Sequence, residues 1–175
     1  MKIKQGSTRF VVQVGVVVFK FPKIRFLGCL KDCFLFLFKK EERIFLKIYF
    51  CSAPFSSSYP GLWYNLFQGI ISNFKEYMFW KKYKNSFCEP TYFSLMGLLN
   101  IQRFSPAYDR FDTKDFWNEM QMVKNYDWDD GHHFSNPENF NIRDGKLLIV
   151  DYSDERTHRV ILKHGQNIIK HFAKL

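Results

Sequence analysis

The chain has 175 residues, 46% of them hydrophobic, which is enough to bury a core in one domain or in a truncated two-lobed one. Its 21 Phe and 9 Tyr supply large apolar side chains and argue against a disordered chain. The formal net charge of +9 favours polyanions such as nucleic acid, nucleotide phosphate or an acidic membrane surface, although basic charges often form nothing more than a solvated surface.

Cysteine usage and the N-terminus predict a cytoplasmic protein with reduced thiols. The four cysteines lack the spacing of a zinc site and the density of a small secreted scaffold. No apolar stretch with a small-residue cleavage site follows Lys2 and Lys4, so we expect no signal peptide. The apolar run Phe34–Phe38 is far shorter than the roughly 20 residues that span a membrane, which predicts a buried strand or helix and no membrane partner.

A β-hairpin is the first predicted element. Gly6-Ser7-Thr8-Arg9 precedes the run 10–12, and a turn near Gly15 leads to the run 16–20, which ends at Lys20. The β-branched residues of both runs favour strands, and the small Gly6 and Ser7 would let backbone amides approach a phosphate. Lys20 has an ordinary alternative role, that of a strand-end lysine whose ammonium reaches solvent.

Residues 23–60 are expected to form an insertion, with a hairpin or short helix followed by a Ser/Pro loop, and we assign them no function. Residues 62–83 then show the spacing of a long amphipathic helix. The residues expected on its inner face are Leu66, Ile70, Phe74 and Tyr77.

Residues 88–93 and 97–103 are expected to be two strands ahead of a hinge at Pro106. Asp112-Thr113 would cap a helix that begins at Lys114. The last twenty residues, 156–175, predict one basic helix. Its apolar side would consist of Val160, Ile161, Ile168 and Phe172.

The segment between these two helices predicts a metal and phosphate site. Asn136-Pro137-Glu138-Asn139 forms a short loop, a hairpin turn is expected at Asp144-Gly145, and the apolar run 147–150 leads into Asp151. This order would place Asn139 close to Asp151. Their amide and carboxylate oxygens suit Mg²⁺, which needs few protein ligands because water and nucleotide phosphates complete its shell.

The loop, the strand and the carboxylate after it resemble the catalytic loop and metal-binding motif of the protein-kinase-like fold, in the small form found in phages and bacteria. The resemblance covers residues 6–24 and 61–153, and it implies an α+β fold with a small mixed N-lobe sheet, one long helix and an abbreviated C-lobe. The N-lobe would span residues 1–105, with the insertion at about 23–60, and the C-lobe residues 106–175.

The resemblance also implies roles for single residues. Lys20 would contact the phosphates of ATP, Glu76 of the long helix would pair with Lys20, and Asn139 and Asp151 would bind Mg²⁺. Glu76 has an ordinary alternative role in a surface pair with a neighbouring lysine. Gly6 and Ser7 would belong to the cofactor-binding loop.

Two departures from the family pattern affect catalysis. The position of the general base, five residues before Asn139, holds Phe134, which cannot accept a proton. Either Asp130 takes that role from a shifted loop or phosphotransfer is absent, so the resemblance implies a kinase or a pseudokinase. The adjacent His132 and His133 are candidates because histidine titrates near neutral pH, but such residues are more often ordinary loop residues.

After Asp154, the helices that complete a larger C-lobe are missing, which predicts exposed apolar surface and a homodimer or a protein partner.

Two functions are compatible with these observations. The first is a kinase-like protein that binds a magnesium nucleotide, with an unknown phosphate acceptor if transfer occurs. The alternative is a basic module that binds nucleic acid or another protein and has no nucleotide site. Nucleotide binding that depends on metal would favour the kinase-like protein. Salt-sensitive binding of an oligonucleotide without metal would favour the basic module.

Overall fold

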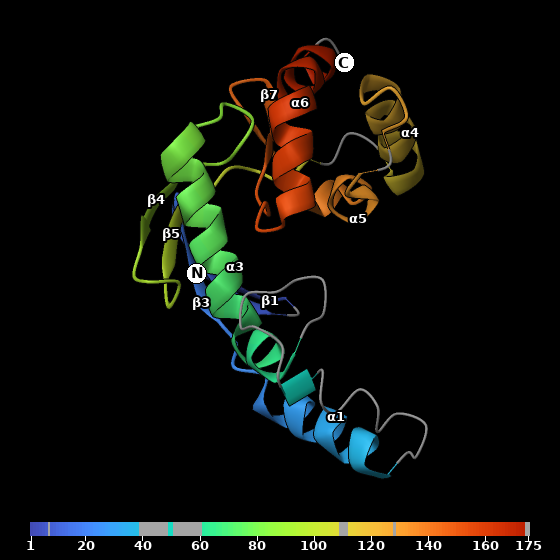
Figure 1. The fold of residues 1–175 in the computed structure, drawn as a ribbon. Helices are drawn as coiled ribbons and strands as arrows, with labels where there is room; N and C mark the ends of the chain where they lie inside the picture. The colour runs from blue at the N-terminus through green and yellow to red at the C-terminus, as the bar shows by residue number, and fades with distance from the viewer. Residues whose placement is uncertain (7, 39–48, 51–60, 109–111, 128, 174–175) are drawn as a thin grey trace.

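The computed structural model describes residues 1–175 except 7, 39–48, 51–60, 109–111, 128 and 174–175. The fold is α+β, with a five-stranded antiparallel sheet, a separate hairpin and several helices (Figure 1). The sheet has the strand order β1-β2-β3-β5-β4. Its strands are β1 (Lys2–Gln5), β2 (Arg9–Val14), β3 (Val17–Pro22), β4 (Thr91–Ser94) and β5 (Asn100–Arg103).

The predicted first hairpin is confirmed. β2 and β3 pair from Arg9 opposite Pro22 to Val14 opposite Val17, and Gly15 in the turn has a φ of +56°. Glycine adopts this left-handed conformation without the steric cost that a side chain brings. The two later strands are also confirmed, with shorter bounds than the sequence indicates.

The long helix α3 (Leu62–Tyr83) has the predicted bounds and runs along the sheet, in contact with β3, β4 and β5 (Figure 1). The predicted inner face of this helix is wrong, because Phe74 is 45% exposed. The buried residues of α3 are Gly69, Ile71, Asn73, Glu76 and Phe79. The hydrophobic periodicity of α3 does not predict its buried face, because the sheet provides polar partners for this helix. Asn73 and Glu76 are therefore buried on the face of α3 that contacts the sheet.

Gly69 explains how α3 comes so close to the sheet. A Cβ atom at this position would lie 2.4 Å from the carbonyl oxygen of Thr8 and 2.9 Å from the Cβ of Pro22. Only glycine leaves room for the backbone of the strand ends at that distance. This contact lies two helical turns before Glu76 on the same side of α3, which brings the carboxylate within reach of the strands.

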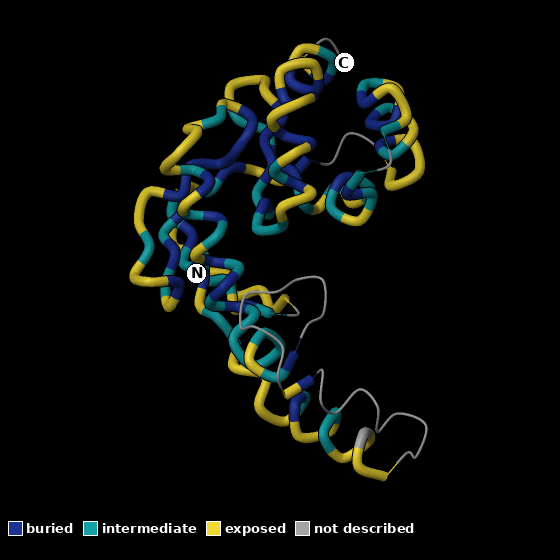
Figure 2. Tube along the Cα trace, in the orientation of Figure 1, coloured by how far each residue is buried: buried dark blue, intermediate teal, exposed yellow. Residues whose placement is uncertain are grey.

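The second group of elements surrounds the main apolar core. It contains α4 (Thr113–Val123), α5 (Gly131–Phe134), the 3₁₀ turn η2 (Pro137–Asn139), β6 (Phe140–Arg143), β7 (Lys146–Ile149) and α6 (Glu155–Phe172). The predicted cap of α4 is confirmed, since the side chain of Asp112 accepts a hydrogen bond from the amide of Asp115. The predicted apolar side of α6 is buried throughout, as Figure 2 shows in dark blue along this helix and β7.

The turn between β6 and β7 is also confirmed. Asp144 and Gly145 both have positive φ, 52° and 72°, which defines the two-residue turn that matches the twist of a hairpin. Phe79 of α3 belongs to the same core cluster as this hairpin, and Cys88 forms a parallel bridge with Ile149. The two groups of elements are thus packed together, and a division at residue 105 stays a prediction.

Helix α1 (Phe26–Phe38) forms most of the described part of the expected insertion. The expectation that Phe34–Phe38 is buried is wrong, because Phe34 is 65% exposed and Phe38 is 72% exposed. α1 contacts α3 but extends away from the sheet, and most of its trace is yellow in Figure 2. The expected Ser/Pro loop lies outside the described residues. Within the described residues, no helix is both long and apolar enough to cross a membrane.

Candidate functional site

The sheet face that points toward α3 carries buried polar side chains. Lys20 lies opposite Val11 on β2 and opposite Asn100 on β5, so residues two apart on these strands share this face. The buried polar residues that the three-dimensional arrangement gathers there are Arg9, Lys20, Thr91, Asn100 and Gln102. Buried polar groups are costly unless they are paired, so the partners of these side chains define the site.

Lys20 and Glu76 form a buried ion pair. The Nζ of Lys20 donates to the Oε1 of Glu76 at 2.6 Å, and the side chain of Glu76 has no exposed surface. Gln102 and Thr91 also donate to Oε1, at 3.3 and 3.4 Å. The ordinary roles considered for Lys20 and Glu76, those of solvent-exposed side chains, are therefore wrong for this fold.

Arg9, for which no role was predicted from the sequence, joins the pair of Lys20 and Glu76 to Asp151. Its Nη1 donates to the Oε2 of Glu76 at 2.6 Å, and its Nη2 donates to the Oδ1 of Asp151 at 2.5 Å. We call Arg9, Lys20, Glu76 and Asp151 the charged cluster. It contains two cations and two carboxylates, so its formal charges cancel.

Asp151 is the most accessible carboxylate of the charged cluster. Its side chain is 34% exposed, whereas that of Glu76 is fully buried. Burial alone would raise the pKa of Asp151, but the charges of Arg9 and Lys20 outweigh it and hold this pKa well below the ordinary value for aspartate. Asp151 is therefore ionised at neutral pH.

The pKa values of the two basic groups shift in opposite directions, although burial acts against both charges. Burial lowers the pKa of Lys20 below that of an ordinary lysine, although Glu76 favours its charged form. Burial also acts against the charge of Arg9, but the carboxylates of Asp151 and Glu76 outweigh it and raise the pKa of Arg9 above its ordinary value.

Asn139 lies beside Val150, the residue before Asp151. The backbone oxygen of Asn139 accepts a hydrogen bond from the amide of Val150 at 2.9 Å, at the base of the β6–β7 hairpin. Lys20 reaches the same segment, because its Nζ donates to the carbonyl oxygen of Val150 at 2.7 Å. The backbone around Val150 thus connects Lys20, Asn139 and Asp151.

Asn139 and Asp151 each carry a side-chain oxygen of the kind that a hard divalent cation prefers. The amide Nδ2 of Asn139 donates to the carbonyl of His133 at 3.0 Å, a bond that does not use Oδ1. Arg9 and Ser153 both donate to the Oδ1 of Asp151, and neither bond uses Oδ2. Within the described part of the chain, no three His, Cys, Asp or Glu side chains gather around a possible metal position. Two protein oxygens are nevertheless compatible with Mg²⁺, which takes the rest of its shell from water and phosphate.

The loop before β2 is tied to neighbouring backbone. The amide of Gly6 donates to the carbonyl of Arg9 at 2.9 Å, and the carbonyl of Thr8 accepts from the amide of Lys23 at 2.8 Å. The Gly6 amide is therefore engaged within the loop. Ser7, the other residue expected to contact a phosphate, lies outside the described residues.

Asp130, the candidate general base, is buried and already paired. Its carboxylate accepts a hydrogen bond from the hydroxyl of Thr157 on α6 and lies 2.7 Å from the Nδ1 of His133. The imidazole is partly buried, which opposes its charge, but Asp130 outweighs burial and raises the pKa of His133. Phe134 is fully buried in the core, so the position expected to hold the base is structural.

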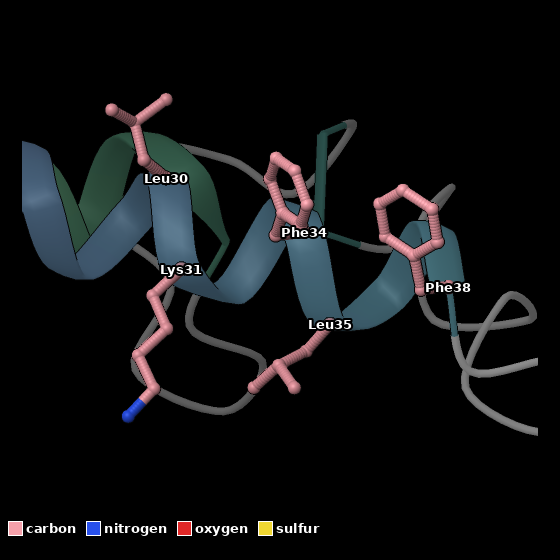
Figure 3. Close-up of a pocket in the computed structure, with 5 residues that line it drawn as sticks. All are labelled: Leu30, Lys31, Phe34, Leu35 and Phe38. Carbon is pink, nitrogen blue, oxygen red and sulfur yellow. The ribbon is translucent and has the colours of Figure 1, made fainter.

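A pocket in the structure lies elsewhere, on helix α1 (Figure 3). Its lining contains no member of the charged cluster and consists of Leu30, Lys31, Phe34, Leu35 and Phe38.

Three comparisons, with models of protein families, with curated proteins and with solved structures, found no match to the chain. A proposal about function therefore depends on the geometry of the charged cluster.

Proposed function

We propose that the chain is a kinase-like protein that binds a magnesium nucleotide at the charged cluster and Asn139. The buried ion pair between Lys20 and Glu76, whose lysine also contacts the backbone next to Asp151, carries this proposal. In the protein-kinase-like fold, a strand lysine held by a helix glutamate contacts nucleotide phosphates, and an aspartate and an asparagine hold the metal.

The order of the elements supports the same function. A hairpin with Lys20, a long helix with Glu76, two further strands, a helix and a loop with Asn139 follow one another as the kinase-like resemblance implies. Glu76 lies 56 residues from Lys20, and Val150 lies 130 residues from it, so their meeting is a property of the fold and not of local sequence.

Each residue would have a distinct task. Glu76 fixes the position of the Lys20 ammonium, which would contact phosphate oxygens. The Oδ1 of Asn139 and the Oδ2 of Asp151 would hold Mg²⁺, which neutralises negative charge on the phosphates when it is bound. Positioning of this kind supplies much of the catalysis in phosphoryl transfer, and a degenerate relative retains binding without it.

The second candidate, a basic module that binds nucleic acid, has less support from the charges. Arg9, Lys20 and Lys124 are buried, so these three of the 26 basic residues are not available to a nucleic acid, and the candidate depends on the net charge of +9 alone. Binding of an oligonucleotide that weakens steeply with salt and needs no metal would favour this candidate.

The test is the thermal shift produced by ATP with Mg²⁺, because a ligand that binds the folded state raises its apparent stability. We expect a shift in the wild type that is lost on addition of EDTA and in Asp151→Asn. The matched control is Asp115→Asn, which removes an exposed carboxylate of α4. Each shift is measured against the same variant without ligand. A wild type that does not respond to ATP and Mg²⁺, with Arg9→Gln equally unresponsive, would overturn the proposal.

A further inference from the structure

Arg9 already holds one carboxylate oxygen of Asp151, the Oδ1, directly beside the Oδ2 that is proposed for Mg²⁺. It is the first residue of β2, directly after the loop of residues 6–8, and only 7% of its surface is exposed. One end of its guanidinium contacts the Oε2 of Glu76, and the other contacts the Oδ1 of Asp151. A planar guanidinium with donors on two edges suits this bridge between two carboxylates.

The bridge joins parts of the chain that are far apart. Arg9 is 67 residues from Glu76 and 142 residues from Asp151. It also connects the sheet to the segment that follows β7. Since Asp151 is both the most accessible carboxylate of the cluster and a proposed metal ligand, its bond to Arg9 affects the charge that a metal would meet.

A metal at Asp151 would be opposed by the guanidinium. Like charges within a few ångströms repel, and the repulsion is stronger at a partly buried position than in water. The carboxylate of Asp151 is already neutralised by Arg9 at 2.5 Å, so it attracts a second cation less than a free carboxylate does. Metal-free ATP brings no such cation and would instead gain from the positive charge of Arg9.

We propose that Arg9 is a built-in counter-cation of the site, which holds Asp151 in the absence of ligand and must release it when a magnesium nucleotide binds. The inference rests on the proposed nucleotide site and adds a residue that controls its cation dependence. Glu76 retains Lys20 when Arg9 moves, because its other oxygen, Oε1, accepts the lysine.

The experiment compares the dissociation constants of ATP with Mg²⁺ and of ATP with EDTA for the wild type and Arg9→Gln. We expect Arg9→Gln to bind ATP with Mg²⁺ at least about tenfold more tightly than the wild type, a typical size for coupling between two sites. The same variant should bind metal-free ATP no better than the wild type. Arg103→Gln, which removes an exposed positive charge from β5 of the same sheet, should change neither constant by as much.

The gain must also depend on Asp151. We expect Arg9→Gln to bring no gain when it is combined with Asp151→Asn, because the carboxylate for which the two cations compete is then absent. Arg9→Lys keeps the charge but cannot bridge both carboxylates, and it should give an intermediate gain. This variant also provides the test if Arg9→Gln does not fold.

Each outcome has a defined meaning. Binding that appears only after Arg9 is replaced would support the inference, since the wild-type site would then be closed. Equal or weaker binding by Arg9→Gln and Arg9→Lys would overturn it. Weaker binding would make Arg9 a phosphate-binding residue, and equal binding would make it structural. If the wild type and the Arg9 variants all fail to bind ATP with and without Mg²⁺, the proposed function fails, and this inference fails with it.

Discussion

Replacement of Glu76 by glutamine tests the buried ion pairs at the center of the fold. Glutamine has nearly the same shape as glutamate, but its neutral amide cannot serve two buried cations. Glu76 accepts two charge-assisted hydrogen bonds of 2.6 Å, from Lys20 and Arg9, and such bonds contribute about 1.5–3 kcal/mol each. The sum agrees with the loss of about 3–5 kcal/mol that follows when one partner of a buried pair is removed.

The free energy of unfolding is measured by urea denaturation and the midpoint by thermal melting. A loss of about 3–5 kcal/mol corresponds to a fall in Tm of about 6–20 °C for a chain of this size. The control is Glu155→Gln, whose carboxylate pairs with Lys75 at 2.9 Å but is 65% exposed. Exposed pairs contribute at most about 1 kcal/mol, so this variant should lose little.

The partner of Glu76 offers a second control within the same experiment. Combining Glu76→Gln with Lys20→Met removes one of the two charges that lose Glu76 as a partner, so the double variant should lose less than the sum of the two single variants. Equal small losses for Glu76→Gln and Glu155→Gln would refute the reasoning, because they would mean that Glu76 is hydrated in solution.

Three further predictions concern packing and titration. Gly69→Ala should lose about 1–3 kcal/mol of unfolding free energy in urea, because the added Cβ would meet the carbonyl of Thr8 at 2.4 Å, and an unchanged midpoint would contradict this contact. The raised pKa of His133 means that its stabilising pairing with Asp130 is fully present below about pH 6.5, its unfolded value, and is lost as the pH rises through the folded value. The difference in unfolding free energy between the wild type and His133→Asn should therefore be larger at about pH 6 than at about pH 9, and a constant difference would contradict it. Burial raises the pKa of Cys88 well above that of an ordinary thiol, so iodoacetamide at about pH 8 should label Cys88 only after urea is added, as read by mass spectrometry of its peptide.

The sequence predicted the positions of helices and strands better than it predicted which of their faces are buried. Helix α3 has the expected bounds because its helical spacing extends over 22 residues without Pro. The prediction of its buried face was wrong because hydrophobic periodicity assumes an apolar inner face, whereas Asn73 and Glu76 bind polar groups of the strands. Phe34 was expected to be buried for the same reason, since an apolar run does not reveal whether another element covers it.

The candidate site was predictable in part. Asn139 lies opposite Val150, the residue before Asp151, because a tight turn sets the register of the β6–β7 hairpin, which is a local property. Arg9 was missed because its partners are distant in sequence. The sequence did contain one sign of a role for Arg9. Arg9 and Val11 are two residues apart on one strand, so their side chains share a face of the sheet. Because Val11 pairs with Lys20, Arg9 and Lys20 also lie on that face.

Isothermal titration of the chain with ATP and Mg²⁺, repeated with Lys20→Met, tests whether a magnesium nucleotide binds at the charged cluster. We expect saturable binding at one site, which is lost with EDTA and weakened in Lys20→Met, while the control Lys114→Met, at an exposed position of α4, binds as the wild type does. The proposed site would be refuted by equal binding in Lys20→Met and the wild type, or by the absence of binding in both the wild type and the Arg9 variants.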